Sequence, residues 1–103
     1  MYKVEIRIEK ITDRNGEDRT DGRYPYRIGR VGYFYNELLV PSCRLGVTYI
    51  HDTDGSSMDG LVLLTSPVHK IQYEDHSGTY IVTTKNSVYY LKRIWKRGNN
   101  DND

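Results

Sequence analysis

The chain has 103 residues, the length of one domain with a single modest hydrophobic core. Its 15 lysines and arginines against 14 aspartates and glutamates give a formal net charge of +1, so no overall field draws it to nucleic acid or to an anionic membrane. Ten tyrosines and no alanine indicate a β protein, because tyrosine suits a pleated surface and alanine is the best helix former.

The N-terminus reads MYKVEIRIEK and alternates apolar with charged residues from Tyr2 to Glu9, which predicts a strand with one buried face. It lacks the uninterrupted apolar core of a secretory signal or a membrane span, so we expect the protein to remain in the cytoplasm of the cell that makes it. The segment from Thr12 to Gly22 is dense in charge and contains the turn pair Asn15-Gly16, which predicts an exposed, mobile loop.

Two glycines and Pro25 interrupt the aromatic run that follows, so Tyr26 to Tyr35 is expected to form an irregular or bent strand. Glu37 to Leu39 predicts one helical turn. Cys43 to His51 predicts a strand in which Cys43 is half-buried, and a single cysteine excludes an internal disulfide.

Asp52 to Gly60 consists of turn formers and predicts a hairpin loop. Beyond it, Leu61 to Thr65 is expected to bend at Pro67 into Val68 to Tyr73, because proline cannot donate a ladder hydrogen bond.

The last predicted strands are Thr79 to Thr84 and Ser87 to Trp95, joined by the two-residue turn Lys85-Asn86. Residues 1–95 should form a single β domain and residues 96–103 a disordered tail. The pattern favours an SH3-like barrel or a highly curved antiparallel sheet of five to seven strands, with an OB-like barrel as the alternative.

Nothing in the motifs indicates catalysis, a metal site or a cofactor. The three histidines, His51, His69 and His76, lack zinc-binding spacing, and no GxSxG elbow is present. A triple such as Ser66, His69 and Asp52 arises by chance in a chain rich in serine and aspartate. Asp52, Asp54 and Asp59 do not have the spacing of an EF-hand calcium loop. From the missing catalytic motifs together, we predict that the protein is not an enzyme.

The segment RIGRVG, residues 27–32, is the best candidate for a binding site. Its glycines allow a ligand to approach the backbone, while Arg27 and Arg30 can hold a phosphate or carboxylate in bidentate geometry. Aromatic side chains that could stack on a ligand flank it: Tyr24, Tyr26, Tyr33, Phe34 and Tyr35. In the alternative interpretation, alternate aromatics point into the core and the arginine stems cover it with their heads in water.

Two hydroxyl clusters could supply further hydrogen bonds, through Ser66 and through Thr84 with Ser87. A structural explanation is also sufficient, since threonine suits strands and serine stabilises turns and corners. A binding role requires these hydroxyls to face the same cleft as Arg27 and Arg30.

The segments TSPVHKI and YIVTTKNSVYYLKRI, preceded by YPYRIGR, resemble small uncharacterised β-domain accessory proteins of bacteriophages and mobile elements in Gram-positive bacteria. The resemblance covers about the last two-thirds of the chain. It implies counter-defence, either by occluding a host protein or by sequestering a nucleotide signal.

We first expect a protein-interaction module, in which tyrosines and arginines form a flat exposed patch without a pocket and an open sheet edge pairs with a host protein. The alternative is a pocket for a small anionic nucleotide of the cyclic or ADP-ribose type, shared between protomers of a homo-oligomer. Nucleic-acid binding comes third, because the basic residues around Trp95 would bind weakly: Lys92, Arg93, Lys96 and Arg97.

Overall fold

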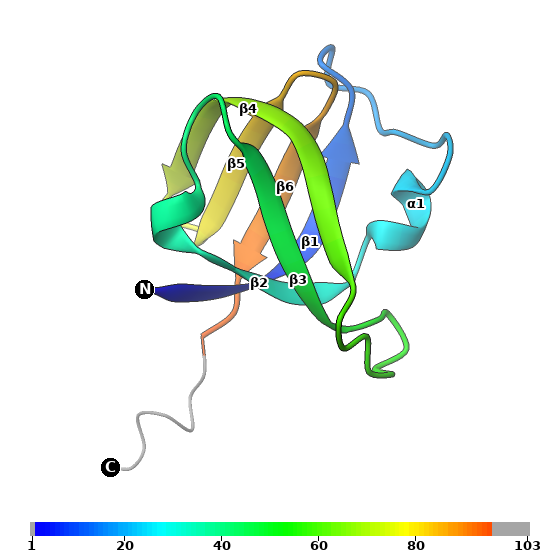
Figure 1. The fold of residues 1–103 in the computed structure, drawn as a ribbon. Coiled ribbons are helices and arrows are strands. Elements are labelled where there is room, and N and C mark those ends of the chain that lie inside the picture. Colours follow the sequence, from blue (N-terminus) through cyan, green and yellow to red (C-terminus); the bar gives the residue numbers. More distant parts are fainter. Residues whose placement is uncertain (1, 96–103) are drawn as a thin grey trace.

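The computed structural model describes residues 2–95, which form one closed antiparallel barrel (Figure 1). Each strand pairs with the next along the chain, and the last pairs with the first. The strands are β1 (Lys3–Thr12), β2 (Val31–Tyr35), β3 (Arg44–His51), β4 (Val62–Glu74), β5 (Thr79–Thr84) and β6 (Val88–Arg93). This confirms the predicted all-β fold, and the chain-order pairing lacks the Greek-key connection of the OB-like alternative.

The core comes from the alternation that the sequence shows in β1. Val4, Ile6 and Ile8 point inward, and a register shift opposite β6 between Ile8 and Lys10 then leaves two successive residues outside before Ile11 is buried. Burial of such side chains contributes about 1.5–3 kcal/mol each. The other strands add Phe34, Leu45, Val47, Tyr49, Leu63, Val68, Tyr80, Val82, Tyr89 and Leu91.

The long strand β4 belongs to both sides of the barrel. Its first half pairs with β3 as far as Pro67, and its second half pairs with β5 from Val68 onward. The predicted corner at Pro67 is therefore a bend within one continuous strand, with register shifts on both of its ladders. One side of Val62 to Ser66 consequently has no strand partner among residues 2–95.

The segment predicted as one bent strand, Tyr26 to Tyr35, is instead a short helix followed by a strand. Helix α1 (Tyr24–Arg27) carries Pro25 in its first turn, where no intrahelical donor is needed. Gly29 then adopts φ 92°, a left-handed conformation that glycine reaches without strain, and leads the chain into β2. A 3-10 turn at Asn36–Leu38 confirms the helical turn expected near Glu37.

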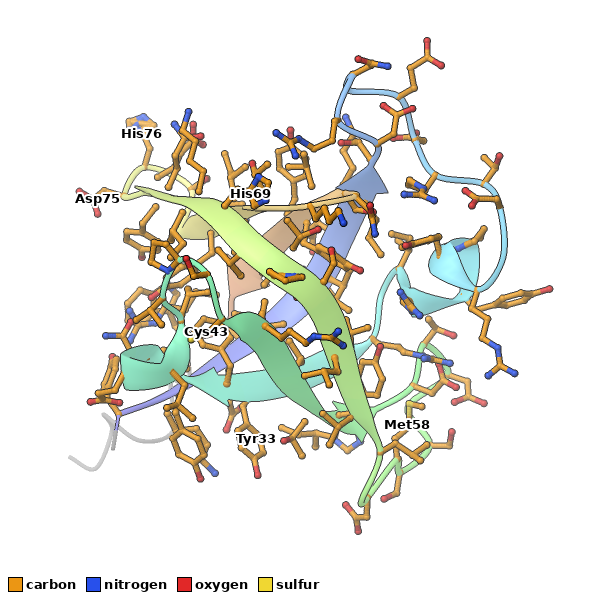
Figure 2. All side chains as sticks on the ribbon, turned by 45° about the horizontal axis from the view of Figure 1, so that its top comes forward. Tyr33, Cys43, Met58, His69, Asp75 and His76 are labelled. Atoms are coloured by element: carbon orange, nitrogen blue, oxygen red, sulfur yellow. The ribbon has the colours of Figure 1, made fainter. Side chains whose placement is uncertain are left out.

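Cys43 lies just before β3 and is exposed, so the prediction of a half-buried strand residue is wrong (Figure 2). Ser42 precedes it at φ 77°, which places this pair in a surface turn. The predicted tail, residues 96–103, lies outside the described residues.

The loop that follows β1 is exposed as predicted, but two arginines tie it to the β5–β6 turn. Arg14 donates to the carbonyl oxygens of Thr84 and Lys85, at 3.1 and 3.2 Å. Arg19 donates to the carbonyl oxygen of Asn86 and to the Ser87 hydroxyl, at 3.0 and 2.8 Å. These contacts attach the loop to the barrel wall beside α1.

Candidate functional site: an arginine cleft

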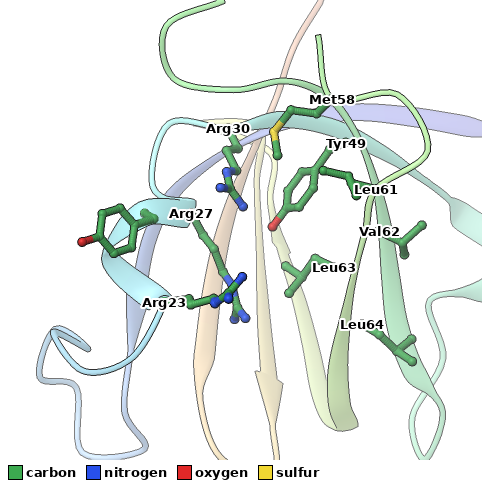
Figure 3. Close-up of a pocket in the computed structure, with 10 residues that line it drawn as sticks. Arg23, Arg27, Arg30, Tyr49, Met58, Leu61, Val62, Leu63 and Leu64 are labelled. Atoms are coloured by element: carbon green, nitrogen blue, oxygen red, sulfur yellow. The ribbon is translucent and has the colours of Figure 1, made fainter. Parts of the chain in front are cut away.

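A cleft of about 700 Å³ separates α1 from the first half of β4 (Figure 3). We call it the arginine cleft. Basic and aromatic residues from α1 and its flanks line one side: Arg23, Tyr26, Arg27 and Arg30. The other side and the floor are mostly apolar: Tyr49, Met58, Leu61, Val62, Leu63 and Leu64.

Arg30 is held in place at the upper end of the cleft. Its Nε donates to Asp52 Oδ1 at 3.2 Å, and its guanidinium carbon lies 4.9 Å from the centre of the Tyr49 ring. Burial lowers the pKa of Arg30, but the nearby Tyr49 hydroxyl and Asp52 carboxylate raise it overall. Arg30 therefore keeps its charge, and part of that charge is already balanced by Asp52.

Arg27 is oriented by aromatic side chains. Its guanidinium carbon lies 4.8 Å from the centre of the Tyr24 ring, and its Nη1 donates to the Tyr89 hydroxyl at 3.4 Å. Burial raises the pKa of Tyr89 to about 12, against the opposing effect of Arg27, so this hydroxyl stays neutral.

Positive charge exceeds negative charge at this site. Among residues 2–95, no carboxylate forms an ion pair with Arg23 or Arg27; the guanidinium ion pairs there are Arg7 with Glu9, Arg19 with Asp21, and Arg30 with Asp52. Guanidinium groups beside low-dielectric walls attract anions more strongly than the same groups on an open surface. The cleft is therefore suited to a carboxylate or a phosphate.

The floor of the cleft contains a buried hydroxyl that is poorly bonded. Tyr49 is only 5% exposed, and its hydroxyl oxygen is the one buried side-chain polar atom within residues 2–95 without a hydrogen bond of normal geometry, although it lies close enough to the Arg30 guanidinium to raise the pKa of Arg30. The hydroxyl points toward the arginine side (Figure 3). Leaving a buried hydroxyl without a well-formed bond costs up to about 1–3 kcal/mol, and the nearest donor that could relieve this cost is the Arg30 guanidinium.

The apolar wall is exposed to an unusual degree. Leu61, Val62 and Leu64 are 54%, 56% and 59% exposed, although all three are large aliphatic residues. Four consecutive residues line the cleft because it runs along the side of β4 that has no strand partner. A ligand on this wall would bury aliphatic surface in addition to meeting the arginines.

The predicted site residues divide into groups. Arg27, Arg30 and Tyr26 line the cleft. Tyr24 lies outside the lining, and its ring contacts the Arg27 guanidinium. Tyr33 and Tyr35 instead line a smaller groove, of about 300 Å³, on the outer face of β2 and β3. Phe34 belongs to the core, as the alternative interpretation of alternating aromatics expected.

The hydroxyl clusters are not brought to the cleft. Thr84 and Ser87 are buried at the β5–β6 turn, where the Thr84 hydroxyl donates to the Ser87 carbonyl oxygen at 3.0 Å. Ser66 lies on β4 outside the lining, and its carbonyl oxygen accepts a hydrogen bond from Thr65. For Thr84 and Ser87 the structural explanation is therefore sufficient.

Sequence reasoning missed half of the cleft. Arg23 lies four residues before Arg27, a spacing that puts two side chains on one helix face, but the segment was interpreted as a strand. Tyr49 looked like any inward-facing strand residue. The uncharged run Leu61 to Leu64 was a signal, since edge strands normally carry charges or proline.

The candidate triple Ser66, His69 and Asp52 is not assembled in the part of the chain that the structure describes. Within residues 2–95, no hydrogen bond links Ser66, His69 and Asp52, and no cluster of three or more His, Cys, Asp or Glu side chains could hold a metal. His69 and His76 lie toward the end of β4 away from Met58 and the cleft (Figure 2).

The third predicted site, around Trp95, is only partly described. The Arg93 guanidinium carbon lies 4.0 Å from the centre of the Trp95 ring, which is itself 64% exposed. Lys96 and Arg97 lie outside the described residues.

No protein-family model, curated protein or solved structure matches this chain. The part of the chain that the structure describes contains no helix long and apolar enough to span a bilayer.

Proposed function

We propose that this protein is a non-enzymatic binding protein, that its binding site is the arginine cleft, and that the cleft receives an anionic segment of a host protein. One observation carries the proposal: Arg23 and Arg27, which lack carboxylate partners within residues 2–95, share a cleft with the poorly bonded Tyr49 hydroxyl. An anion that accepts from the guanidinium groups would compensate charges that the fold itself leaves unbalanced.

The extent of the surface supports a protein as the partner. Val62 and Leu64 line both the arginine cleft and the groove beside Tyr33 and Tyr35, so the two depressions meet across the exposed face of β4. Arginine, tyrosine and large aliphatic residues are the side chains that dominate binding energy at protein interfaces. The contact surface that we propose is concave at the arginines, whereas the sequence led us to expect a flat patch without a pocket.

The setting that we propose is bacteriophage counter-defence, in which the protein occludes a component of the host. This part rests on the resemblance of the sequence to phage accessory proteins. A small, non-enzymatic protein can act in this way by covering a functional surface of its target.

A small anionic nucleotide is the second candidate ligand. The cleft volume falls within the range of small-molecule sites, about 300–1,000 Å³. Tyr26, 70% exposed at the rim, offers a ring for stacking, while Arg23 and Arg27 could hold phosphates.

Native mass spectrometry of the protein purified from bacterial cells tests the proposal. The cleft variant is Arg23→Ala/Arg27→Ala, and the matched control is Arg7→Ala/Lys70→Ala, which removes two exposed cations elsewhere. We expect wild type and control to carry a host protein at fixed stoichiometry and the cleft variant to lose it. A bound nucleotide mass with the same dependence on the arginines would favour the second candidate. If the folded cleft variant carried the host protein as well as the wild type does, the arginine cleft would not be the binding site.

A further inference from the structure

The side of β4 that borders the arginine cleft is an open strand edge. Strand β3 pairs with Val62, Leu63 and Leu64, whereas β5 joins the opposite side only from Val68 onward. Within residues 2–95 no strand pairs with this side of Val62 to Ser66, and residues of α1 line the cleft that it borders. The barrel is closed as a whole, yet about five residues of one strand remain available for pairing.

Backbone hydrogen bonds show which groups are available. The Leu61 carbonyl oxygen accepts from the Tyr49 amide of β3 at 2.9 Å. Ladder bonds of an antiparallel pair alternate along the strand, so Leu63 also turns its N–H and C=O toward β3. Val62 and Leu64 therefore turn theirs toward the cleft, and both residues are more than half exposed.

This edge has little of the usual protection against pairing, because Pro67 and the register shifts lie only at its C-terminal end. Natural edge strands carry lysine, proline, bulges or inward-pointing charges, because an open row of N–H and C=O groups recruits other chains. The run from Leu61 to Ser66 has no charged residue and no proline before Pro67. An exposed, apolar edge of this kind is expected where another strand is meant to bind.

The positive charge on the opposite wall of the cleft favours an acidic strand as the partner of this edge. Arg23, Arg27 and Arg30 line the wall opposite the edge, and Asp52 balances only one of them. A second copy that offered the same edge would bring two sets of arginines together, which opposes pairing of the protein with itself. An acidic chain has no such penalty.

We propose that an extended acidic segment of a partner protein adds to the barrel as a strand along the Val62–Ser66 edge. Its main chain bonds to Val62 and Leu64, and its carboxylates meet Arg23 and Arg27. This inference rests on the proposed function and specifies how the cleft would hold its ligand. Five residues of strand span roughly 17 Å, so a segment of five to seven residues is sufficient.

The probe is a capped heptapeptide, acetyl-Glu-Val-Glu-Val-Glu-Val-Glu-amide, added to the full-length protein. Calorimetry measures the affinity of the peptide. Amide hydrogen exchange, followed by NMR, shows whether the peptide protects the backbone N–H groups of the Val62–Ser66 edge. Two N-methylated forms serve as matched probes, one methylated at the glutamates and the other at the valines. Because alternate residues of a strand face the same neighbour, only one of these forms blocks pairing with β4.

We expect the heptapeptide to bind and to slow exchange at Val62 and Leu64, while Leu63, already bonded to β3, changes little. One N-methylated form should bind about tenfold more weakly and the other nearly as well, since removing each backbone bond costs affinity. The Arg23→Ala/Arg27→Ala variant should bind the parent peptide at least about tenfold more weakly, through loss of two charge-assisted contacts.

Three results would overturn the inference and separate it from the proposed function. In the first result, the peptide binds in an arginine-dependent way, but amide exchange at Val62 and Leu64 is not slowed and both N-methylated forms bind equally well. The cleft would then bind an anion without adding a strand. Arginine-dependent binding of ADP-ribose or cyclic di-AMP in place of the peptide supports the nucleotide candidate. Binding of none of these probes contradicts both the inference and the proposed function.

Discussion

The segment between β1 and β2 carries two groups of arginines that look alike in the sequence and differ in the fold. Arg14 and Arg19 bond to the β5–β6 turn, and Arg19 also forms two hydrogen bonds with the Asp21 carboxylate. Arg23 and Arg27, a few residues later, face the cleft without a carboxylate partner within residues 2–95.

The comparison shows why the number of arginines does not locate a binding site. The guanidinium group of Arg19 donates to Ser87, Asn86 and Asp21, so its donors are already used by the fold. Arg27 has one long hydrogen bond to Tyr89 and an aromatic contact, which orient it and leave donors available. We infer that Arg19 contributes stability and Arg27 contributes recognition.

The largest expected effect is a pH-dependent loss of stability at Tyr89, the buried tyrosine whose hydroxyl accepts a hydrogen bond from Arg27. Burial raises the pKa of Tyr89 from 10.0 to about 12, so between these values the folded protein keeps a proton that the unfolded chain has released. The free energy of unfolding should fall as pH rises through this window, approaching a loss of about 3 kcal/mol above pH 12. Urea unfolding between pH 9 and 12.5 measures it.

The Tyr89→Phe variant is the control, because it has no proton to lose at this position. Its stability should decline less steeply over the same range, with a remaining slope from other groups such as Tyr80, whose pKa burial also raises. Parallel slopes for the two proteins would show that Tyr89 ionises as an ordinary tyrosine.

The next effect tests the stabilising arginine directly. Arg19→Ala removes the partner of the buried Ser87 hydroxyl as well as a bond to the Asn86 carbonyl, and should lower the free energy of unfolding by about 2 kcal/mol. Arg23→Ala, the matched change in the second group, should stay within about 0.5 kcal/mol. Chemical denaturation at neutral pH measures the free energy of unfolding of both variants. Equal losses of stability would contradict the assignment of Arg19 to stability and of the cleft arginines to recognition.

The smallest effect has the opposite sign. Tyr49→Phe removes the poorly bonded hydroxyl and keeps the ring that Arg30 contacts, so the ligand-free protein should gain about 1 kcal/mol. Affinity for the acidic heptapeptide should fall by about tenfold, through loss of a hydrogen bond from this hydroxyl to a bound carboxylate. Thermal unfolding combined with calorimetry would show the two changes together. A variant that loses stability as well as affinity would instead assign the hydroxyl a structural role.

Much of the fold could be predicted because its signals are local. The alternation of β1, the turn at Lys85-Asn86 and the bend at Pro67 each depend on neighbours in the chain, and all three are confirmed. The helix at Tyr24–Arg27 was missed because four residues are too few to show a helical period. The environment of Cys43 depends on where β3 begins, which residue type alone does not specify.

The site was predictable only in part. Arg27, Arg30 and Tyr26 were identified from residue chemistry, since arginines beside glycines and aromatics can bind anions wherever they lie. Thr84 and Ser87 have the same chemistry as binding hydroxyls, but the β5–β6 turn buries them against each other. Only the packing of distant segments distinguishes the two cases.

By itself, the sequence determined the strands, the position of the bend in β4 and the residue types available for binding an anion, because these follow from side-chain shape, backbone restriction and charge. Only the tertiary structure decided which arginines find partners inside the fold. It also decided that, within residues 2–95, the Tyr49 hydroxyl has no hydrogen bond of normal geometry and one side of Val62 to Ser66 has no strand partner. These properties are long-range, because residues far apart in the chain supply each partner, as Lys85 does for Arg14 across 71 positions.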